Sequence, residues 1–313
     1  MDLPILHHYW GSPYAEKIRL LLGYKKIDWL SCEIPVTPPR PNLAQVLGPF
    51  RRTPVLQLGA DFICDTRLIA EAIDEFAPQP SLRTPANQAL SQMICYWGEP
   101  RMFALLGPVR FRTAEDIAGA FNGAVSADQF GADRLPFMHP VYEAHRFGKI
   151  RASSLDHLRS YMDTLEVFFA GGDDFVGGGT PTFGDFSAYH TVWWLRMPPD
   201  HAGFLADYPA IKRWADRMAA FGHGTHRAID DDDARQIMSR ARIAFQPGWK
   251  PRVDRRLGQI VEIVPDDYGK NPVEGKVVAM TDRHVTIERA TADMRTVRIH
   301  FPRMGYEIVT IGN

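Results

Sequence analysis

The sequence predicts a mixed α/β domain over residues 1–80, an all-α domain over 84–243 and a small all-β, barrel-like domain over 248–313. Strand and helix patterns alternate in the first region, and helical spacing alone fills the second. In the third, short runs rich in β-branched residues are separated by turn residues, which is typical of small barrels and sandwiches. The length of 313 residues agrees with two domains and a further small one.

The charge balance and the cysteines exclude several classes of protein. With 36 basic and 37 acidic side chains the net charge is −1, so neither nucleic acid nor a membrane is an expected partner. Cys32, Cys64 and Cys95 form no CxxC pair, which argues against disulfides and a structural zinc site. The chain opens without a basic leader and has no run of about 20 apolar residues, so we expect a cytoplasmic protein.

Local signals predict the elements of the first region. Ser12 is a good N-cap and Pro13 suits the first helical position, so a helix is predicted over Pro13–Tyr24. The prolines between residues 35 and 41 predict a loop. The other predicted elements are strands at Leu3–Tyr9 and Asp28–Ile34, a hairpin of Pro54–Leu58 with Phe62–Cys64, and a helix at Thr66–Phe76.

The second and third regions differ in their hydrophobic period. We interpret the acidic run 230–233 as a solvated helix N-terminus and not a metal site, because no His or Cys stands at ligand spacing from it. Helices are predicted at Asn87–Leu106, Ser154–Phe169, Phe183–Arg196 and Pro209–Phe221. Strands are predicted at Leu257–Val264, Glu274–Met280, His284–Arg289 and Arg295–Phe301.

Ser12, Pro13 and Tyr14 stand at the start of the first helix. A hydroxyl at such a place lies beside backbone N–H groups that no helical carbonyl accepts, and beside the positive end of the helix dipole. This environment stabilises an anion, including the thiolate of a bound ligand.

Two further motifs suit the remainder of a small thiol peptide. Thr53 precedes Pro54 at a strand start, where a cis bond would turn the backbone N–H and C=O of Thr53 outward, toward an extended peptide. Thr66 and the nearby N–H groups offer a carboxylate site at the next helix, and Asp65 can take an ammonium group. The three motifs together predict a ligand with a thiol, a peptide backbone and an amino-acid head.

The segments Ser12–Leu22, Thr53–Leu56 and Asp65–Ile69 together resemble the glutathione S-transferase family. Pro181–Phe186 is similar to the N-capping box of that family's helical domain. The resemblance covers residues 3–225, although 107–150 matches nothing in it. It implies a thioredoxin-like first domain, a helical second domain, glutathione as co-substrate between them, and a homodimer. From the spacing of the cysteines and of the acidic run, we expect no metal.

By position, Ser12 matches the residue that activates the glutathione thiol in the family, with Tyr14 and Tyr9 as alternatives. The resemblance further implies a cis-proline and backbone pairing for the cysteinyl part, and an acid–hydroxyl pair for the γ-glutamyl head. The glutathione-binding candidates are Arg52, with Arg51 as its alternative for the glycine carboxylate, Thr53, Pro54, Asp65 and Thr66.

The implied activity is that of a glutathione transferase, as in detoxification: the activated thiolate attacks a small electrophile on a surface of the helical domain. A second hypothesis is a binding or regulatory protein of the same architecture that has little catalysis and acts through its C-terminal module. The added strands and the unmatched stretch 107–150 favour it. The candidates to line the electrophile pocket are some of Tyr96, Trp97, Arg101 and Met102, with the helical core as the alternative place for such a stripe.

Overall fold

The computed structural model describes residues 3–83, 88–111, 113–134, 151–197, 202–243, 245, 248, 250–293 and 295–311. The chain divides into two compact units. The first contains Met1–Ile18, Lys26–Pro78 and Gly224–Asn313, and the second contains Arg19–Lys25 and Gln79–His223. The C-terminal strands therefore fall in the same unit as the N-terminal residues, where the sequence predicted a domain of their own.

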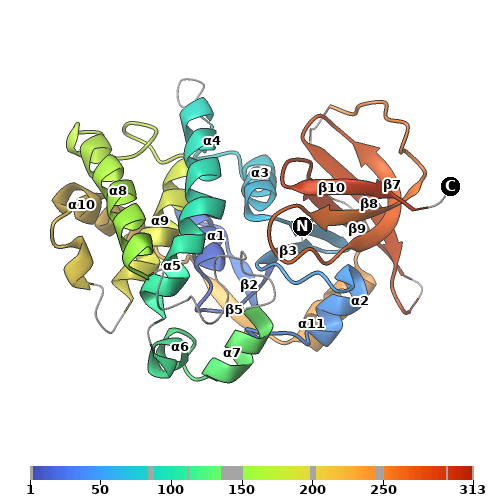
Figure 1. Cartoon of the computed structure of the whole chain (residues 1–313). Helices are drawn as coiled ribbons and strands as arrows, with labels where there is room; N and C mark the ends of the chain where they lie inside the picture. Colours follow the sequence, from blue (N-terminus) through green and yellow to red (C-terminus); the bar gives the residue numbers. More distant parts are fainter. Residues whose placement is uncertain are drawn as a thin grey trace. The chain divides into compact units, whose positions relative to one another are not determined.

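The N-terminal part of the first unit has the predicted thioredoxin-like order of strands and helices (Figure 1). The helix after Ser12 and the helix after Asp65 begin and end at the predicted residues. The two helix starts follow from N-caps that act within one turn of the chain. The elements are β1 (Ile5–His8), α1 (Pro13–Tyr24), β2 (Trp29–Glu33), α2 (Pro41–Leu47), β3 (Val55–Leu58), β4 (Asp61–Cys64) and α3 (Thr66–Phe76).

The C-terminal part of the first unit adds strands at both edges of this sheet. One short strand, β5 (His226–Ile229), pairs in parallel with β2. At the other edge β9 pairs in parallel with β4, where Phe62 is the partner of Ile299. The added elements are β5, α11 (Asp231–Arg240), β6 (Ile260–Pro265), β7 (Val273–Met280), β8 (His284–Ala290), β9 (Thr296–Pro302) and β10 (Tyr306–Thr310).

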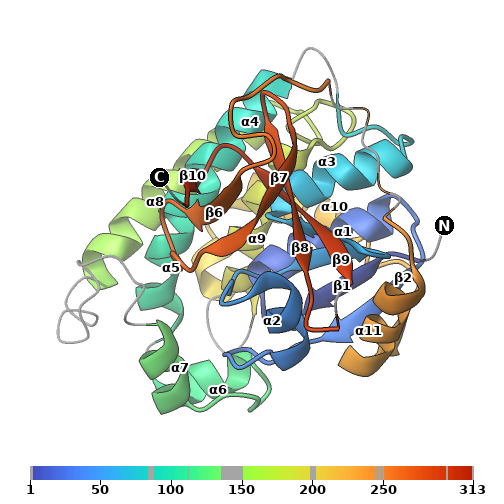
Figure 2. The same cartoon turned by 90° about the vertical axis from the view of Figure 1, so that its right-hand side faces the viewer.

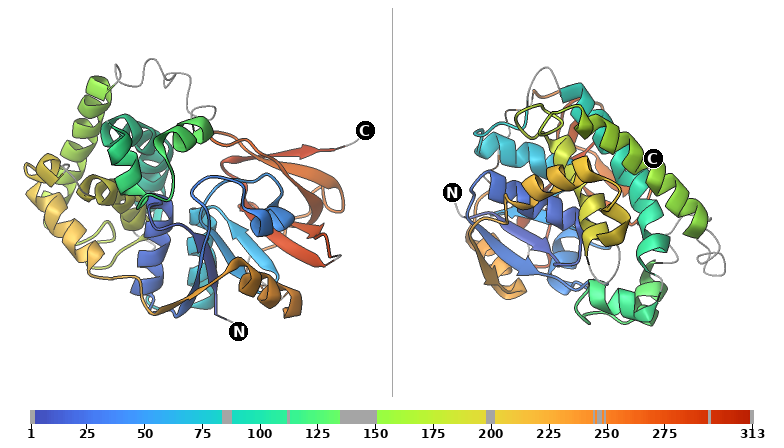
Figure 3. Two further views of the ribbon diagram at one scale, coloured as in Figure 1. Left: turned by 90° about the horizontal axis from the view of Figure 1, so that it is seen from below. Right: turned by 90° about the vertical axis from the view of Figure 1, so that its left-hand side faces the viewer.

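Within the described residues the strands form one ten-stranded sheet in the order β10-β6-β7-β8-β9-β4-β3-β1-β2-β5. The orange and red strands continue directly from the blue ones in Figure 3. Along the C-terminal strands, buried and exposed residues alternate in β6 and β7, and the buried side chains join those of β3 and β4 in one hydrophobic cluster. Val55, Phe62 and Cys64 belong to the same cluster as Val277, Ile287 and Ile299.

This shared cluster corrects the predicted domain boundaries. The strand-rich region is present as predicted, but its core is not separate from that of the thioredoxin-like part. Residues 224–243, predicted as part of the all-α domain, instead supply β5 and α11 to the first unit. Helix α11 lies beside α2 (Figure 2).

The second unit is helical, as the sequence predicted (green to yellow in Figure 3). The long apolar stripe of α8 is buried, with Leu158, Met162 and Leu165 each at most 3% exposed. Part of the unmatched stretch forms α6 and α7, while 135–150 lies outside the described residues. The helices are α4 (Gln88–Trp97), a π-helical turn (Gly98–Met102), α5 (Phe103–Arg110), α6 (Ala114–Ala120), α7 (Ala127–Arg134), α8 (Arg151–Ala170), α9 (Phe183–Arg196) and α10 (Pro209–Ala219).

The predicted capping box stands at the start of α9. The backbone N–H of Thr182 donates to Oδ2 of Asp185 at 2.8 Å, and both bonds of the box are present. Oδ1 of Asp185 accepts from the Val176 N–H at 2.8 Å and from Nε1 of Trp214 at 3.0 Å. The box thus also ties α9 to α10. Among the described helices none is long and apolar enough to cross a bilayer.

Candidate active site

The strand register brings the three predicted motifs to one end of the sheet. His7 in β1 pairs with Val55 in β3, and Val55 pairs with Cys64 in β4. The Thr53–Pro54 step therefore lies beside the Asp65–Thr66 step, because antiparallel partners keep adjacent residues adjacent. The chain leaving β1 leads at the same end into Ser12.

Ser12 caps α1 with its side chain. The residue is 2% exposed, and its Oγ accepts from the N–H of Ala15 at 3.2 Å. Its carbonyl accepts from the Glu16 N–H at 2.9 Å, which starts the helical ladder. Since Oγ acts as an acceptor in the cap, its own proton is left to donate to an anion at the helix N-terminus.

The two tyrosines near Ser12 differ in their surroundings. Tyr14 is half-buried in the first turn of α1, and Nζ of Lys17 lies 4.8 Å from the centroid of its ring. Tyr9 is half-buried at the end of β1 and packs against the shared hydrophobic cluster. A cation over the Tyr14 ring is attracted by the negative face of the ring.

The loop before β3 is held by Arg40, a buried residue that sequence reasoning missed. The peptide bond between Thr53 and Pro54 is cis. Nη1 of Arg40 donates to Oγ1 of Thr53 at 3.0 Å and to the carbonyl of Arg51 at 2.7 Å. Its Nε and Nη2 donate to the carbonyls of Pro35 and Val36. No spacing signal marks such an arginine, because its partners are mostly backbone carbonyls of a proline-rich loop.

Asp65 carries a strained backbone and a paired carboxylate. Its φ is 74°, in the left-handed region, and it caps α3 by accepting from the Arg67 N–H at 2.9 Å. The Arg67 guanidinium donates to both carboxylate oxygens at 3.2 Å. Burial acts to raise the pKa of Asp65, but Arg67, with a smaller contribution from Arg52, lowers it overall. Thr66 beside it is 5% exposed.

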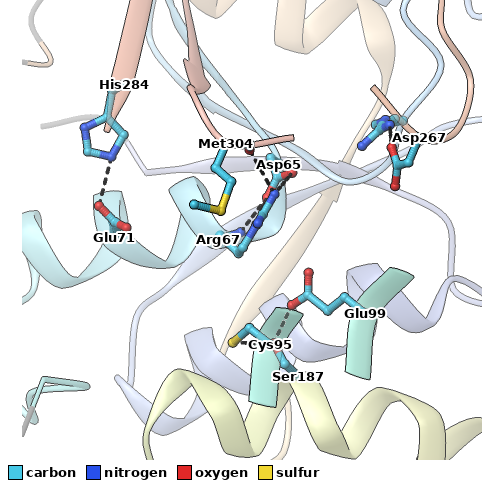
Figure 4. Close-up of polar contacts among 10 residues, drawn as sticks. Asp65, Arg67, Glu71, Cys95, Glu99, Ser187, Asp267, His284 and Met304 are labelled. Atoms are coloured by element: carbon cyan, nitrogen blue, oxygen red, sulfur yellow. Dashed lines mark hydrogen bonds and ion pairs between the residues drawn. The ribbon is translucent and has the colours of Figure 1, made fainter. Parts of the chain in front are cut away.

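Two turns of the C-terminal strands contact these site residues. Nη2 of Arg67 donates to the carbonyl of Met304 at 3.2 Å (Figure 4). Gly305 has a φ of 89°, and a Cβ there would lie 3.0 Å from the same Nη2 atom. Residues 303–306 therefore approach Arg67 as closely as a glycine permits.

The second turn holds Arg52. Nε and Nη2 of Arg52 donate to the carbonyl of Tyr268 at 3.1 and 2.6 Å, and Nη2 is also paired with the carboxylate of Asp267. Gly269 has a φ of 59°, and a Cβ there would lie 2.9 Å from Cδ of Arg51. Both arginines proposed for the glycine carboxylate thus contact the turn at 267–269.

Tyr306 of β10 completes this cluster from the C-terminal side. Its ring faces Arg52, whose Cζ is 5.3 Å from the ring centroid. Its hydroxyl is buried and has no hydrogen-bond partner among the described residues. Burial, together with the negative charge of Asp65, raises the pKa of Tyr306 well above its ordinary value. The phenol is therefore a neutral donor, and nothing in the sequence marked it as part of the site.

The predicted electrophile-binding residues of the second unit are partly exposed. Tyr96 and Trp97 on α4 are 41% and 39% exposed, while Met102 is buried at 4%. The side chain of Arg101 lies outside the described part of the chain. The same helices hold a buried polar cluster in which the Ser187 hydroxyl donates to Oε1 of Glu99 at 2.5 Å and accepts from the Cys95 thiol at 3.3 Å (Figure 4).

Family comparisons agree with this division of the chain. The model of the glutathione S-transferase N-terminal domain matches residues 6–81, and that of the glutathione S-transferase C-terminal domain matches 139–217. "Probable maleylacetoacetate isomerase 1" of Drosophila melanogaster is 27% identical over 111 residues, 31% of this chain. The chain spans 44% of the length of that relative.

Solved structures support the same family. A GST-like protein from Pseudomonas syringae is 28% identical, covers 99% of this chain and 100% of its own, and has a TM-score of 0.79. The Tau class glutathione S-transferase of mango is 18% identical and covers 76% of this chain and 96% of its own, with a TM-score of 0.50, so it shows the fold alone. The near-complete coverage by the Pseudomonas syringae protein includes the C-terminal strands. Together these matches support the glutathione S-transferase family for this chain.

Proposed function

We propose that the protein is a cytoplasmic glutathione transferase that activates the glutathione thiolate at the N-terminus of α1. The observation that carries the proposal is the buried Oγ of Ser12, which caps the helix at the end of the sheet where Thr53 and Asp65 also lie. A thiolate there would accept a hydrogen bond from the Ser12 hydroxyl and be stabilised by the helix dipole, and both effects lower the thiol pKa. The thiolate would then attack a small electrophile, and the active protein would be a homodimer.

Glutathione would be recognised by the residues around Ser12. Thr53 would pair through its backbone with the cysteinyl part, since Pro54 is cis and Arg40 fixes the loop. Thr66 and the N-terminal N–H groups of α3 would bind the γ-glutamyl carboxylate. Asp65 would take the ammonium group in partial exchange for Arg67, its present partner.

Tyr306 would be a further residue of this glutathione site, one that the sequence did not predict. Its buried hydroxyl has no partner among the described residues, its ring faces Arg52, and the charge of Asp65 acts to raise its pKa, so we expect the hydroxyl to donate to the γ-glutamyl carboxylate. A buried donor without a partner costs free energy that a ligand can recover. The C-terminal strands would then form part of the substrate site.

Calorimetry with glutathione and an assay with 1-chloro-2,4-dinitrobenzene test the proposal. Ser12→Gly removes the hydroxyl yet keeps a residue that is tolerated as an N-cap. Ser239→Ala in α11, whose hydroxyl makes an exposed hydrogen bond to the Gln236 carbonyl, is the control. If Ser12 activates the thiol, Ser12→Gly lowers kcat at least about tenfold and raises the pKa of bound glutathione, read from thiolate absorbance. Equal turnover and an equal thiol pKa in both variants would remove that role from Ser12.

Two other outcomes are informative. The likeness to a probable maleylacetoacetate isomerase suggests isomerisation as another use of the same thiolate, and maleylacetoacetate is the substrate to assay. The alternative of a weakly catalytic binding protein is favoured by the turns that engage Arg52 and Arg67. Absence of glutathione binding at millimolar concentration would support that alternative.

A further inference from the structure

A histidine, a cysteine and an aspartate from three elements converge on one face of the sheet in the first unit. His7 of β1 and Cys32 of β2 are direct partners in the parallel ladder, so their side chains lie on the same face. They are 4% and 0% exposed. Cys32 also pairs with Ile229 of β5, and the chain then turns at Asp230 into α11. This path brings Asp231 back over the same face.

The three side chains lie at ligand spacing. A ring nitrogen of His7, Sγ of Cys32 and a carboxylate oxygen of Asp231 all lie within 4.8 Å of one another. Sγ of Cys32 and Oδ1 of Asp231 are 3.3 Å apart, and the thiol donates to the carboxylate. A tetrahedral zinc ion, about 2.3 Å from sulfur and about 2.0 Å from oxygen, holds two such ligands about 3.5 Å apart.

Gln57 fixes which nitrogen of His7 can serve as a ligand. The Gln57 Nε2 donates to the carbonyls of Gly59 and Ala234 at 3.0 and 3.1 Å, so its Oε1 must be the atom 2.8 Å from Nε2 of His7. Because a carbonyl oxygen only accepts, Nε2 of His7 carries the proton and Nδ1 keeps a lone pair. Nδ1 is buried and has no hydrogen-bond partner in the described chain.

This arrangement is the one that metal-binding histidines use. The ring nitrogen that does not bind the ion donates to an oxygen, which fixes the tautomer and the ring orientation. A cavity of about 20 Å³ is lined by two of the three residues, His7 and Asp231, and by Gln57 among others. A space of that size admits one water molecule as a fourth ligand.

We propose that His7 Nδ1, the Cys32 thiolate and the Asp231 carboxylate bind a divalent transition-metal ion of the zinc type, with water completing a tetrahedral shell. On binding, the S–H bond of Cys32 breaks, a sulfur–metal bond forms and the proton passes to solvent, with no change in oxidation state. The ion links β1 and β2 to the start of α11.

The experiment uses the full-length chain without a histidine tag, treated with a chelator and then titrated with Co²⁺ and with Zn²⁺. A thiolate bound to Co²⁺ gives a sulfur-to-cobalt charge-transfer absorption that a site of nitrogen and oxygen ligands lacks. We expect one Co²⁺ to bind per chain with this absorption, Zn²⁺ to displace it, and the melting temperature to rise with either ion.

Matched variants separate this site from adventitious binding. Asp231 and Asp232 are neighbours in the first turn of α11, so Asp231→Asn and Asp232→Asn make the same charge change. Asp231→Asn should weaken Co²⁺ at least about tenfold, whereas Asp232→Asn should leave its affinity nearly unchanged. Cys32→Ser should abolish the charge-transfer absorption, and Cys64→Ser, at a second fully buried cysteine, should keep it.

Two results would overturn the proposal. One is a wild-type chain that gives no charge-transfer absorption with Co²⁺, and the other is an equal loss of affinity in Asp231→Asn and Asp232→Asn. Asp231 is half-buried and Asp232 is exposed, so we expect both Asn variants to fold. The comparison of their Co²⁺ affinities therefore tests the site even if Cys32→Ser does not fold.

Discussion

The guanidinium of Arg52 lies over the ring of Tyr306, with Cζ 5.3 Å from the ring centroid. The first residue precedes β3 and the second begins the last strand, so the contact joins segments more than 250 residues apart in the chain. Such cation–π contacts contribute about 0.5–2 kcal/mol. Arg52 is also paired with the turn at 267–268, and these contacts connect the last strands to the glutathione-binding candidates.

Tyr306→Phe removes one oxygen atom and tests the role of the hydroxyl. Because the hydroxyl has no partner in the described chain, we expect the free energy of unfolding to change by less than about 1 kcal/mol. We expect the Kd for glutathione to rise about tenfold, since a hydrogen bond to a charged group is lost. Calorimetry measures the Kd, and urea unfolding measures the stability.

Tyr268→Phe is the matched control for that experiment. Tyr268 meets Arg52 through its backbone carbonyl, so loss of its hydroxyl should leave the Kd unchanged. If both variants weaken glutathione equally, or neither does, Tyr306 has no direct part in binding.

The Asp65–Arg67 pair predicts a pH dependence of stability. The folded pKa of Asp65 is lowered, so its charge stabilises the fold at pH values above the unfolded pKa of about 3.9. That contribution is lost as the pH falls through the folded pKa. The wild type should therefore exceed Asp65→Asn in stability at pH 7, and the difference should shrink below pH 4. A difference that is constant with pH would show that the carboxylate charge does not stabilise the fold.

The sequence predicted those parts of the fold that local chemistry determines. Helices α1, α3 and α9 begin after Ser12, Asp65 and Thr182. The first two side chains accept from an N–H two or three residues later, and the Asp185 carboxylate in the first turn of α9 accepts from the N–H of Thr182. The strand-rich character of the last region was also readable from its β-branched runs. These signals need no knowledge of the rest of the chain.

Pairing between distant segments was not predictable in the same way. The parallel pairing of Phe62 with Ile299 depends on the whole fold, since any strand edge of suitable pattern could have served. The same reason hid Tyr306 and Arg40 from the predicted site. The acidic run was interpreted from sequence spacing, whereas His7 and Cys32 reach Asp231 through the strand order β1-β2-β5.

Asp185 gives a second pH-dependent prediction, with the opposite sign. Burial raises its pKa from 3.8 to about 6, although four donors partly offset the burial. The folded state therefore holds this proton more tightly, so the contribution of Asp185 to stability decreases as the pH rises from 4 to 6. The difference between the two pKa values corresponds to a change of at most about 3 kcal/mol in the free energy of unfolding.

Asp185→Asn isolates that titration. An amide has one oxygen that accepts and one NH2 group that only donates, so it cannot replace both carboxylate oxygens as acceptors for Thr182, Val176 and Trp214. We therefore expect the substitution to lower the free energy of unfolding by about 1–3 kcal/mol at pH 7. Urea unfolding at pH 4 and pH 7 should show the larger gap between wild type and variant at pH 4. A gap that widens toward pH 7 would contradict the raised pKa.

The shared hydrophobic cluster predicts that the C-terminal strands and the thioredoxin-like part unfold together. Ile299 of β9 is fully buried in that cluster, whereas Ile311 is 42% exposed. Ile299→Ala should cost about 2–5 kcal/mol and Ile311→Ala less than about 0.5 kcal/mol. Amide hydrogen exchange should show that Ile299→Ala lowers protection in β1 and β3 as much as in β8 and β9. A loss of protection confined to residues 248–313 would instead indicate the independent domain that the sequence predicted, because a separate core would open without exposing Val55 and Phe62.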